Sequence, residues 1–122
     1  MIIAFDIDDT LILPPEATGL DRDTPNYEVI AIYRFFQVQG ERMIVWSGGG
    51  ESYARMWGEK LGLNADEYRH KKADPTIDIC FDDCIVDLAK VNVRVKRWNN
   101  SVARTLPQDR FRVSPELITP NK

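Results

Sequence analysis

The first 95 residues alternate between short apolar runs and segments in which apolar residues recur at helical spacing. A short apolar run bounded by polar residues is typical of a strand buried on both faces, as in a parallel sheet. Such runs predict strands at residues 1–7, 43–46 and 77–81, and the alternating residues 91–95 predict an edge-like last strand. Residues 66–70 fit either a short strand or an extended loop.

The first helix is predicted to begin at Thr24 as N-cap, with Pro25 in its first turn, and to end at Gly40. We expect it to bury Val29, Ile30, Tyr33 and Phe36, with Ile32 and Phe35 widening the apolar face.

A second helix is predicted over residues 51–61, and Gly62 followed by Leu63 predicts a Schellman ending. We expect this helix to bury Tyr53, Met56, Trp57 and Leu61. Shorter helices are predicted around Asp87 and at residues 101–106, the latter in an otherwise loosely packed tail.

Strands that alternate with helices predict one Rossmann-like α/β domain with a mainly parallel sheet and helices on both faces, in three layers. The domain would span residues 1–122, with its core in about residues 1–95 and a basic C-terminal segment in residues 96–122. The segment from Leu11 to Asp23 is long for a connection, and Pro14, Pro15 and Gly19 argue against regular structure in it. It is either a flap over the neighbouring carboxylates or a surface loop with no role.

Composition indicates a globular protein, with 43% hydrophobic and 29% charged residues and no apolar run long enough to cross a membrane. Because Met1 leads directly into the first strand, we expect no signal peptide. Cys80 and Cys84 lack the spacing of a zinc site. We expect two thiols of a reducing compartment, with Cys80 buried and the protein cytoplasmic.

Charge is distributed unevenly, with a net −8 over residues 1–90 and +5 over residues 91–122. A basic end on an acidic body could attract a polyanion such as nucleic acid, or it could simply balance an acidic site. The oligomeric state is left open.

Polar groups follow three of the predicted strands: Asp6 and Asp8, then Ser47 with three glycines, then Asp82 and Asp83. The carboxyl ends of parallel strands lie at one edge of the sheet, where open α/β sheets bind ligands, so these groups converge. Several carboxylates sharing one site require a cation, and oxygen ligands favour Mg²⁺. An EF-hand is excluded because Leu11 and Ala17 stand where it needs Gly and Glu.

Each of these features has a simpler explanation when taken alone. Acidic residues solvate turns, a glycine-rich segment allows a tight turn, and the pair Lys71-Lys72 fits a solvated patch. Together, carboxylates for a hard metal, Ser47 with Gly48 and Gly49 as anion donors, and a lysine suggest phosphoryl transfer to or from a phosphorylated substrate.

The order of these motifs resembles that of the haloacid dehalogenase (HAD) superfamily of phosphatases. The residues that carry the resemblance are Asp6-Ile7-Asp8-Asp9-Thr10, Trp46-Ser47-Gly48, Lys71-Lys72 and Phe81-Asp82-Asp83. The resemblance implies that Asp6 is a nucleophile forming an aspartyl-phosphate, and that Asp8 is the general acid and base. It also implies that Thr10 holds the loop carrying both aspartates.

The same resemblance implies that Mg²⁺ is held by Asp6, the backbone carbonyl of Asp8 and Asp82, with Asp83 acting directly or through water. Ser47 would hydrogen-bond the phosphate, and a lysine would offset its charge. Lys72 is favoured for that role, with Lys71 as the alternative. Lys71 stays open because the family often has Pro directly after this lysine, whereas here Ala73-Asp74-Pro75 follows Lys72.

The chain has no room for the cap domain that many family members carry, so it resembles the capless branch, whose substrates can be large. A nucleic-acid end is one such substrate. The basic residues that would suit it are Arg94, Lys96, Arg97 and Arg104. Two alternatives are a catalytically silent HAD-like binding or regulatory module and a receiver-like signalling domain. The motif order argues against the receiver, whose phosphorylated Asp ends the third strand.

Overall fold

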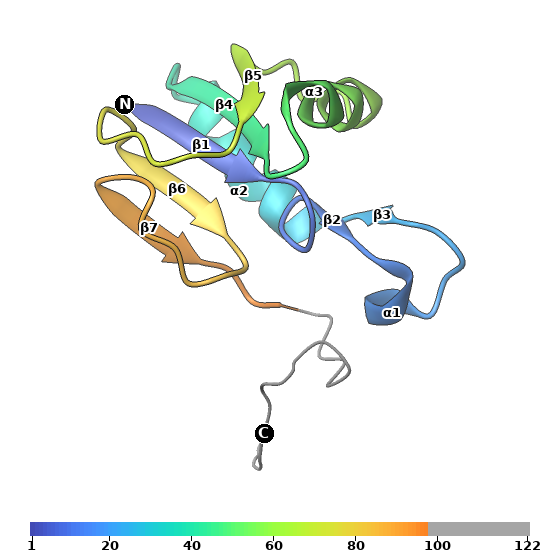
Figure 1. The fold of residues 1–122 in the computed structure, drawn as a ribbon. Helices are drawn as coiled ribbons and strands as arrows, with labels where there is room; N and C mark the ends of the chain where they lie inside the picture. The colour runs from blue at the N-terminus through green and yellow to red at the C-terminus, as the bar shows by residue number, and fades with distance from the viewer. Residues whose placement is uncertain (98–122) are drawn as a thin grey trace.

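The computed structural model describes residues 1–97, which form a five-stranded sheet in the order β5-β4-β1-β6-β7, with every strand parallel to its neighbours (Figure 1). The strands are β1 Ile2–Asp6, β4 Arg42–Ser47, β5 Glu67–His70, β6 Ile79–Asp82 and β7 Val91–Arg94. This confirms the predicted Rossmann-like α/β fold, and a strand forms in residues 66–70, where two alternatives were open. The helix predicted at residues 101–106 and the tail around it lie outside the described residues.

The central strand β1 sets the register of the sheet. Phe5 pairs with Val45 of β4 on one side and with Phe81 of β6 on the other. One residue further along, Asp6 therefore comes beside Asp82, and both strands end there. Chain connections leave β1 toward β4 and β5, then return to β6 and β7 on its other side, so β1 lies at the point where the strand order reverses.

One face of the sheet is covered by the two longer helices, α2 Tyr27–Val38 and α3 Glu51–Lys60 (Figure 1). Tyr33 of α2 packs edge-on against Phe5 at 5.2 Å between ring centroids, and Phe5 stacks on Phe81 at 4.5 Å. Gly58 brings α3 close to β5, because a Cβ at this position would lie 2.1 Å from the Tyr68 ring. This packing fixes the beginning of α3 at the edge where the strands end.

The opposite face is covered by connecting segments. Trp46, Ile77 and Cys80 are buried there, with Val86, Leu88 and Ala89 from the connection between β6 and β7 packed against them. Within residues 1–97 this third layer contains loops, where helices were expected, because the connections after β5 and β6 span only residues 71–78 and 83–90, which is short for a stable helix. Cys80 is buried, as predicted.

The beginning of α2 differs from the prediction. Thr24 and Pro25 form a short strand, β3, that pairs antiparallel with β2, Ile12–Leu13, and the helix begins after Asn26. A backbone hydrogen bond from Asn26 N–H to Leu11 O holds this segment extended, so Thr24 is not the N-cap. Ile32 and Phe35 are exposed, so the apolar face of α2 is narrower than predicted.

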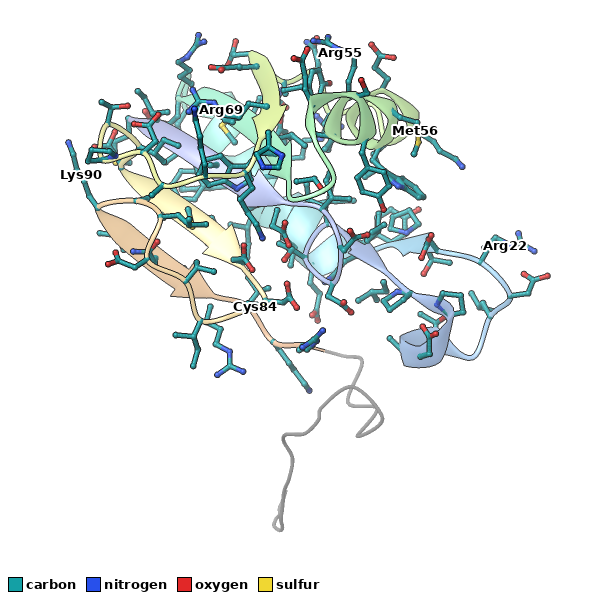
Figure 2. The ribbon with its side chains drawn as sticks, viewed as in Figure 1. Arg22, Arg55, Met56, Arg69, Cys84 and Lys90 are labelled. Atoms are coloured by element: carbon teal, nitrogen blue, oxygen red, sulfur yellow. The ribbon has the colours of Figure 1, made fainter. Side chains whose placement is uncertain are left out.

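The Schellman ending of α3 is confirmed, because Gly62 N–H bonds Glu59 O, Leu63 N–H bonds Gly58 O and Gly62 has φ +66°. Met56, in contrast, points outward from α3 and is exposed (Figure 2). The short helix predicted around Asp87 does not form, and this residue lies in an irregular loop.

The segment 11–25 is structured, which corrects the prediction that its prolines exclude regular structure. Pro15 opens a one-turn helix, α1 Pro15–Thr18, a position proline tolerates because the first helical N–H has no partner anyway. This helix joins β2 to β3 in an arm that extends from the end of β1 (Figure 1). We call residues 11–25 the flap.

Across residues 1–97, no helix has both the length and the apolar character needed to cross a bilayer.

Candidate active site

Two buried aspartates and a lysine form the centre of the site. Asp6 at the end of β1 and Asp82 at the end of β6 are 5% and 0% exposed. The Nζ of Lys71 lies 3.2 Å from Asp6 Oδ1 and 2.9 Å from Asp82 Oδ2, bridging the two carboxylates. The cluster is therefore one cation between two anions, in a place where water screens the charges poorly.

Burial and mutual repulsion change the acidity of these groups. Burial, reinforced by the negative charge of Asp82, raises the pKa of Asp6 to about 7, although Lys71 acts against the shift. Burial also raises the pKa of Asp83 to about 6, against the lowering effect of Arg97. For Lys71, burial lowers the pKa, but its hydrogen bond to Asp82 and the charge of Asp6 outweigh burial and hold the pKa above its usual value.

Lys71 reaches the site because β5 continues alongside β4. Its backbone N–H donates to Ser47 O at 2.9 Å, which carries the parallel pairing one residue beyond His70. Lys72 is the next residue, and it is exposed. The structure thus brings Lys71 to the carboxylates, and the choice of Lys72 from sequence is corrected.

The turn after β4 presents hydrogen-bond donors. Ser47 is 2% exposed, and its Oγ accepts a 2.9 Å hydrogen bond from Gly49 N–H. Because a hydroxyl can accept and donate at once, its own proton stays available for an anion. Gly50 has φ +105°, a conformation that favours glycine, and α3 begins directly after it.

The turn after β1 separates Asp8 from Asp6. The N–H groups of Thr10, Leu11 and Ile12 all donate to Ile7 O, and Asp9 has a positive φ of 61°. Thr10 is fully buried, with its hydroxyl 3.4 Å from Asp6 Oδ2, so it links the turn to the strand end as the sequence suggested. Asp8 is exposed and accepts a 2.7 Å hydrogen bond from the Tyr53 hydroxyl.

Three residues around the site were not among the predicted catalytic, phosphate-binding or metal-ligating residues, although Arg97 was predicted to suit a nucleic-acid substrate. Arg97, just beyond β7, forms ion pairs with Asp83 at 3.3 Å and with Asp9 at 3.7 Å. Cys84 lies at the end of β6 beside the carboxylates (Figure 2), and its N–H donates to Asp82 Oδ1 at 2.9 Å. The third is Tyr53. The signals available were the position of Arg97 after the last parallel strand and of Tyr53 in the first turn after the glycines.

The strand ends and turns of this site line an open cavity of about 370 Å³. Its described lining is Asp6, Asp8, Asp9, Ser47, Gly48, Gly49, Lys71, Asp83, Cys84 and Arg97. A second cavity of about 300 Å³ shares Asp8 and Asp9 with it and is otherwise lined by Ile12, Pro14 and Asp23 of the flap. The flap therefore flanks the site beside Asp8, whereas we had considered a flap lying over the carboxylates.

The residues at this edge suit a hard divalent cation. Asp6, Asp82 and Asp83 are all buried, and carboxylates together with the Asp8 carbonyl are the oxygen ligands that Mg²⁺ prefers. The pKa values of Asp6 and Asp83 are raised mainly by burial and further by the negative charge of Asp82, and a cation would oppose both effects.

Comparison with protein-family models, with curated proteins and with solved structures finds no match for this chain.

Proposed function

We propose that the protein is a Mg²⁺-dependent phosphomonoesterase that works through an aspartyl-phosphate. The observation that carries the proposal is the pairing of a buried Asp6, held by Lys71, with an exposed Asp8 two residues later. Ser47 and the glycine turn, from another strand end, face the same cavity. The resemblance of these motifs to the HAD superfamily supports the same reaction.

Asp6 would attack phosphorus, forming an Asp6 O–P bond as the bond from phosphorus to the leaving oxygen breaks. Asp8 would give its proton to that oxygen. The resulting Asp8 carboxylate would then remove a proton from water as the water oxygen attacks phosphorus and the Asp6 O–P bond breaks. This returns Asp6 as a carboxylate and Asp8 as an acid.

The other groups would bind the phosphoryl oxygens throughout. The Ser47 hydroxyl and the N–H groups of the glycine turn would donate to them, and Lys71 would offset the charge that develops. Asp6, Asp82 and the Asp8 carbonyl would hold Mg²⁺, with Asp83 acting directly or through water. When bound, Mg²⁺ supplies positive charge to the phosphate and lowers its repulsion of Asp6.

The open cavity leaves room for a large phosphorylated substrate, such as a nucleic-acid end. Arg97 lines the cavity, and Arg94 donates to Asp83 O at 3.3 Å beside it. Binding of a phosphorylated oligonucleotide should weaken steeply with salt. Binding that ignored salt and a polyanion competitor would exclude this substrate class. A cytoplasmic location remains part of the proposal, because both thiols are free.

The test is phosphate release from p-nitrophenyl phosphate by the native protein and by Asp6→Asn, each with Mg²⁺ or with EDTA. We expect turnover only for the native protein with Mg²⁺. A folded native protein that binds Mg²⁺ but releases no phosphate leaves two explanations, which are strict substrate selection and a catalytically silent binding module. Trapping of beryllofluoride, which mimics the aspartyl-phosphate, would favour strict substrate selection, and its absence would favour the silent module. Failure to bind either ligand would remove the proposal altogether.

A further inference from the structure

The Asp8 carboxylate is held by a residue of α3. The Tyr53 hydroxyl donates a 2.7 Å hydrogen bond to Asp8 Oδ1, although the two residues are 45 positions apart in the chain. Asp8 is exposed and belongs to a turn, so without a partner its side chain would be free to change rotamer. The bond therefore selects one orientation of the carboxylate.

Tyr53 is itself held in place by the glycine turn. Its half-buried ring lies against this turn, since a Cβ on Gly49 would be 3.4 Å from both the Tyr53 ring and Ser47 Oγ. The ring is therefore fixed between α3 and the turn, with its hydroxyl donating to Asp8.

We infer that Tyr53 is a positioning residue for the proton that Asp8 delivers to the leaving group. Asp8 Oδ1 accepts the hydrogen bond from the tyrosine hydroxyl. When Asp8 is in its neutral form, its acidic proton is therefore held on the other oxygen, Oδ2. During reaction this proton moves from Oδ2 to the departing oxygen as the phosphorus–oxygen bond breaks. The inference rests on the proposed function. It adds Tyr53 to the residues of the site and identifies Oδ2 as the Asp8 oxygen that carries the proton.

The dependence of rate on the leaving group tests the role. A p-nitrophenolate leaves readily without a proton, whereas a benzyl alkoxide needs one. We compare kcat/KM for p-nitrophenyl, phenyl and benzyl phosphate, because this ratio reports the steps up to formation of the aspartyl-phosphate. We expect Tyr53→Phe to lower kcat/KM for benzyl phosphate about tenfold or more, and for p-nitrophenyl phosphate less than about threefold.

The matched control is Tyr33→Phe, which removes a buried tyrosine hydroxyl that donates to Leu63 O at 3.2 Å, away from the cavity. It should not change the leaving-group dependence. Equal loss on all three substrates with Tyr53→Phe, or no loss, would overturn the positioning role and leave the proposed function standing. If the native protein hydrolyses none of them, the proposed function fails and the inference falls with it.

Discussion

Asp6 and Asp8 are the same residue type two positions apart, yet they occupy opposite environments. Asp6 is 5% exposed and contacts Lys71 and Thr10, whereas Asp8 is exposed and contacts Tyr53. The difference arises because β1 ends at Asp6 and the next residues turn away from the sheet. Two carboxyl groups with different surroundings can perform different chemistry, one as nucleophile and the other as proton donor.

Replacing each aspartate by asparagine tests whether the two carboxyl groups have different roles. Asp6→Asn removes the proposed nucleophile, and we expect kcat to fall by more than about 10³-fold with no early burst of p-nitrophenol. Asp8→Asn keeps the nucleophile but cannot activate water. We expect kcat to fall by about 10²- to 10³-fold, after a burst of up to one p-nitrophenol per protein molecule. Rapid-mixing measurements with p-nitrophenyl phosphate distinguish the two.

A burst from Asp6→Asn, or identical kinetics for both variants, would contradict the division of roles. Circular dichroism of each variant shows whether a loss of activity reflects unfolding.

A second test removes the cation that holds Asp6. Lys71→Met should lower kcat/KM by about 10²-fold, because it removes charge stabilisation at the phosphate and leaves two buried carboxylates without their shared partner. Lys72→Met is the matched control, since this neighbour is exposed, and it should stay within about twofold of the native protein. A larger effect from Lys72→Met would restore the assignment made from sequence.

The sequence predicted the site at the level of strand ends but could not decide between adjacent lysines. Which side chain faces the site depends on where β5 ends against β4, and a slip of one residue reverses the faces of a strand. Only the pairing of Lys71 N–H with Ser47 O settles the register. The strand ends could be predicted because carboxylates stand directly after apolar runs.

Other departures have the same cause, which is that tertiary contacts override local signals. Thr24 followed by Pro25 is a good helix start by itself, yet pairing with β2 makes both residues extended. Tyr53 fitted the apolar face of a helix, and nothing in the local pattern shows that its hydroxyl reaches Asp8. Helical spacing also predicted that Phe35 widens the apolar face of α2, but this residue is exposed.

The smallest predicted effect concerns stability in the absence of metal. The folded-state pKa values of Asp6 and Asp83, about 7 and about 6, lie above the ordinary value near 4 of an unfolded chain. The folded state therefore binds more protons between pH 5 and 7, and the free energy of unfolding should rise by about 1 to 2 kcal/mol as pH falls across that window. Asp74 acts oppositely, but its pKa is lowered to about 2, so its contribution disappears only below about pH 4.

Urea unfolding in EDTA at pH 5, 6 and 7 measures this change. Asp6→Asn should flatten the dependence, because it removes the most strongly shifted group. Mg²⁺ should stabilise the native protein more at pH 8 than at pH 5.5, since protons compete for the same oxygens. Stability that falls steadily from pH 7 to pH 5 in EDTA would show that the pKa values of Asp6 and Asp83 are not raised in the folded state.

The loop that replaces a helix on the second face of the sheet has a consequence for motion. Asp83 and Cys84 at its beginning line the cavity, while Val86, Leu88 and Ala89 further along cover buried Trp46. Asn92 Oδ1 ties this part to β7 through the Leu88 and Ala89 amides at 2.8 and 3.0 Å. Because this one short segment both lines the cavity and covers part of the core, a local opening of the segment would expose the core and the site together. Ligand at the site would then slow amide hydrogen exchange on the far side of the sheet.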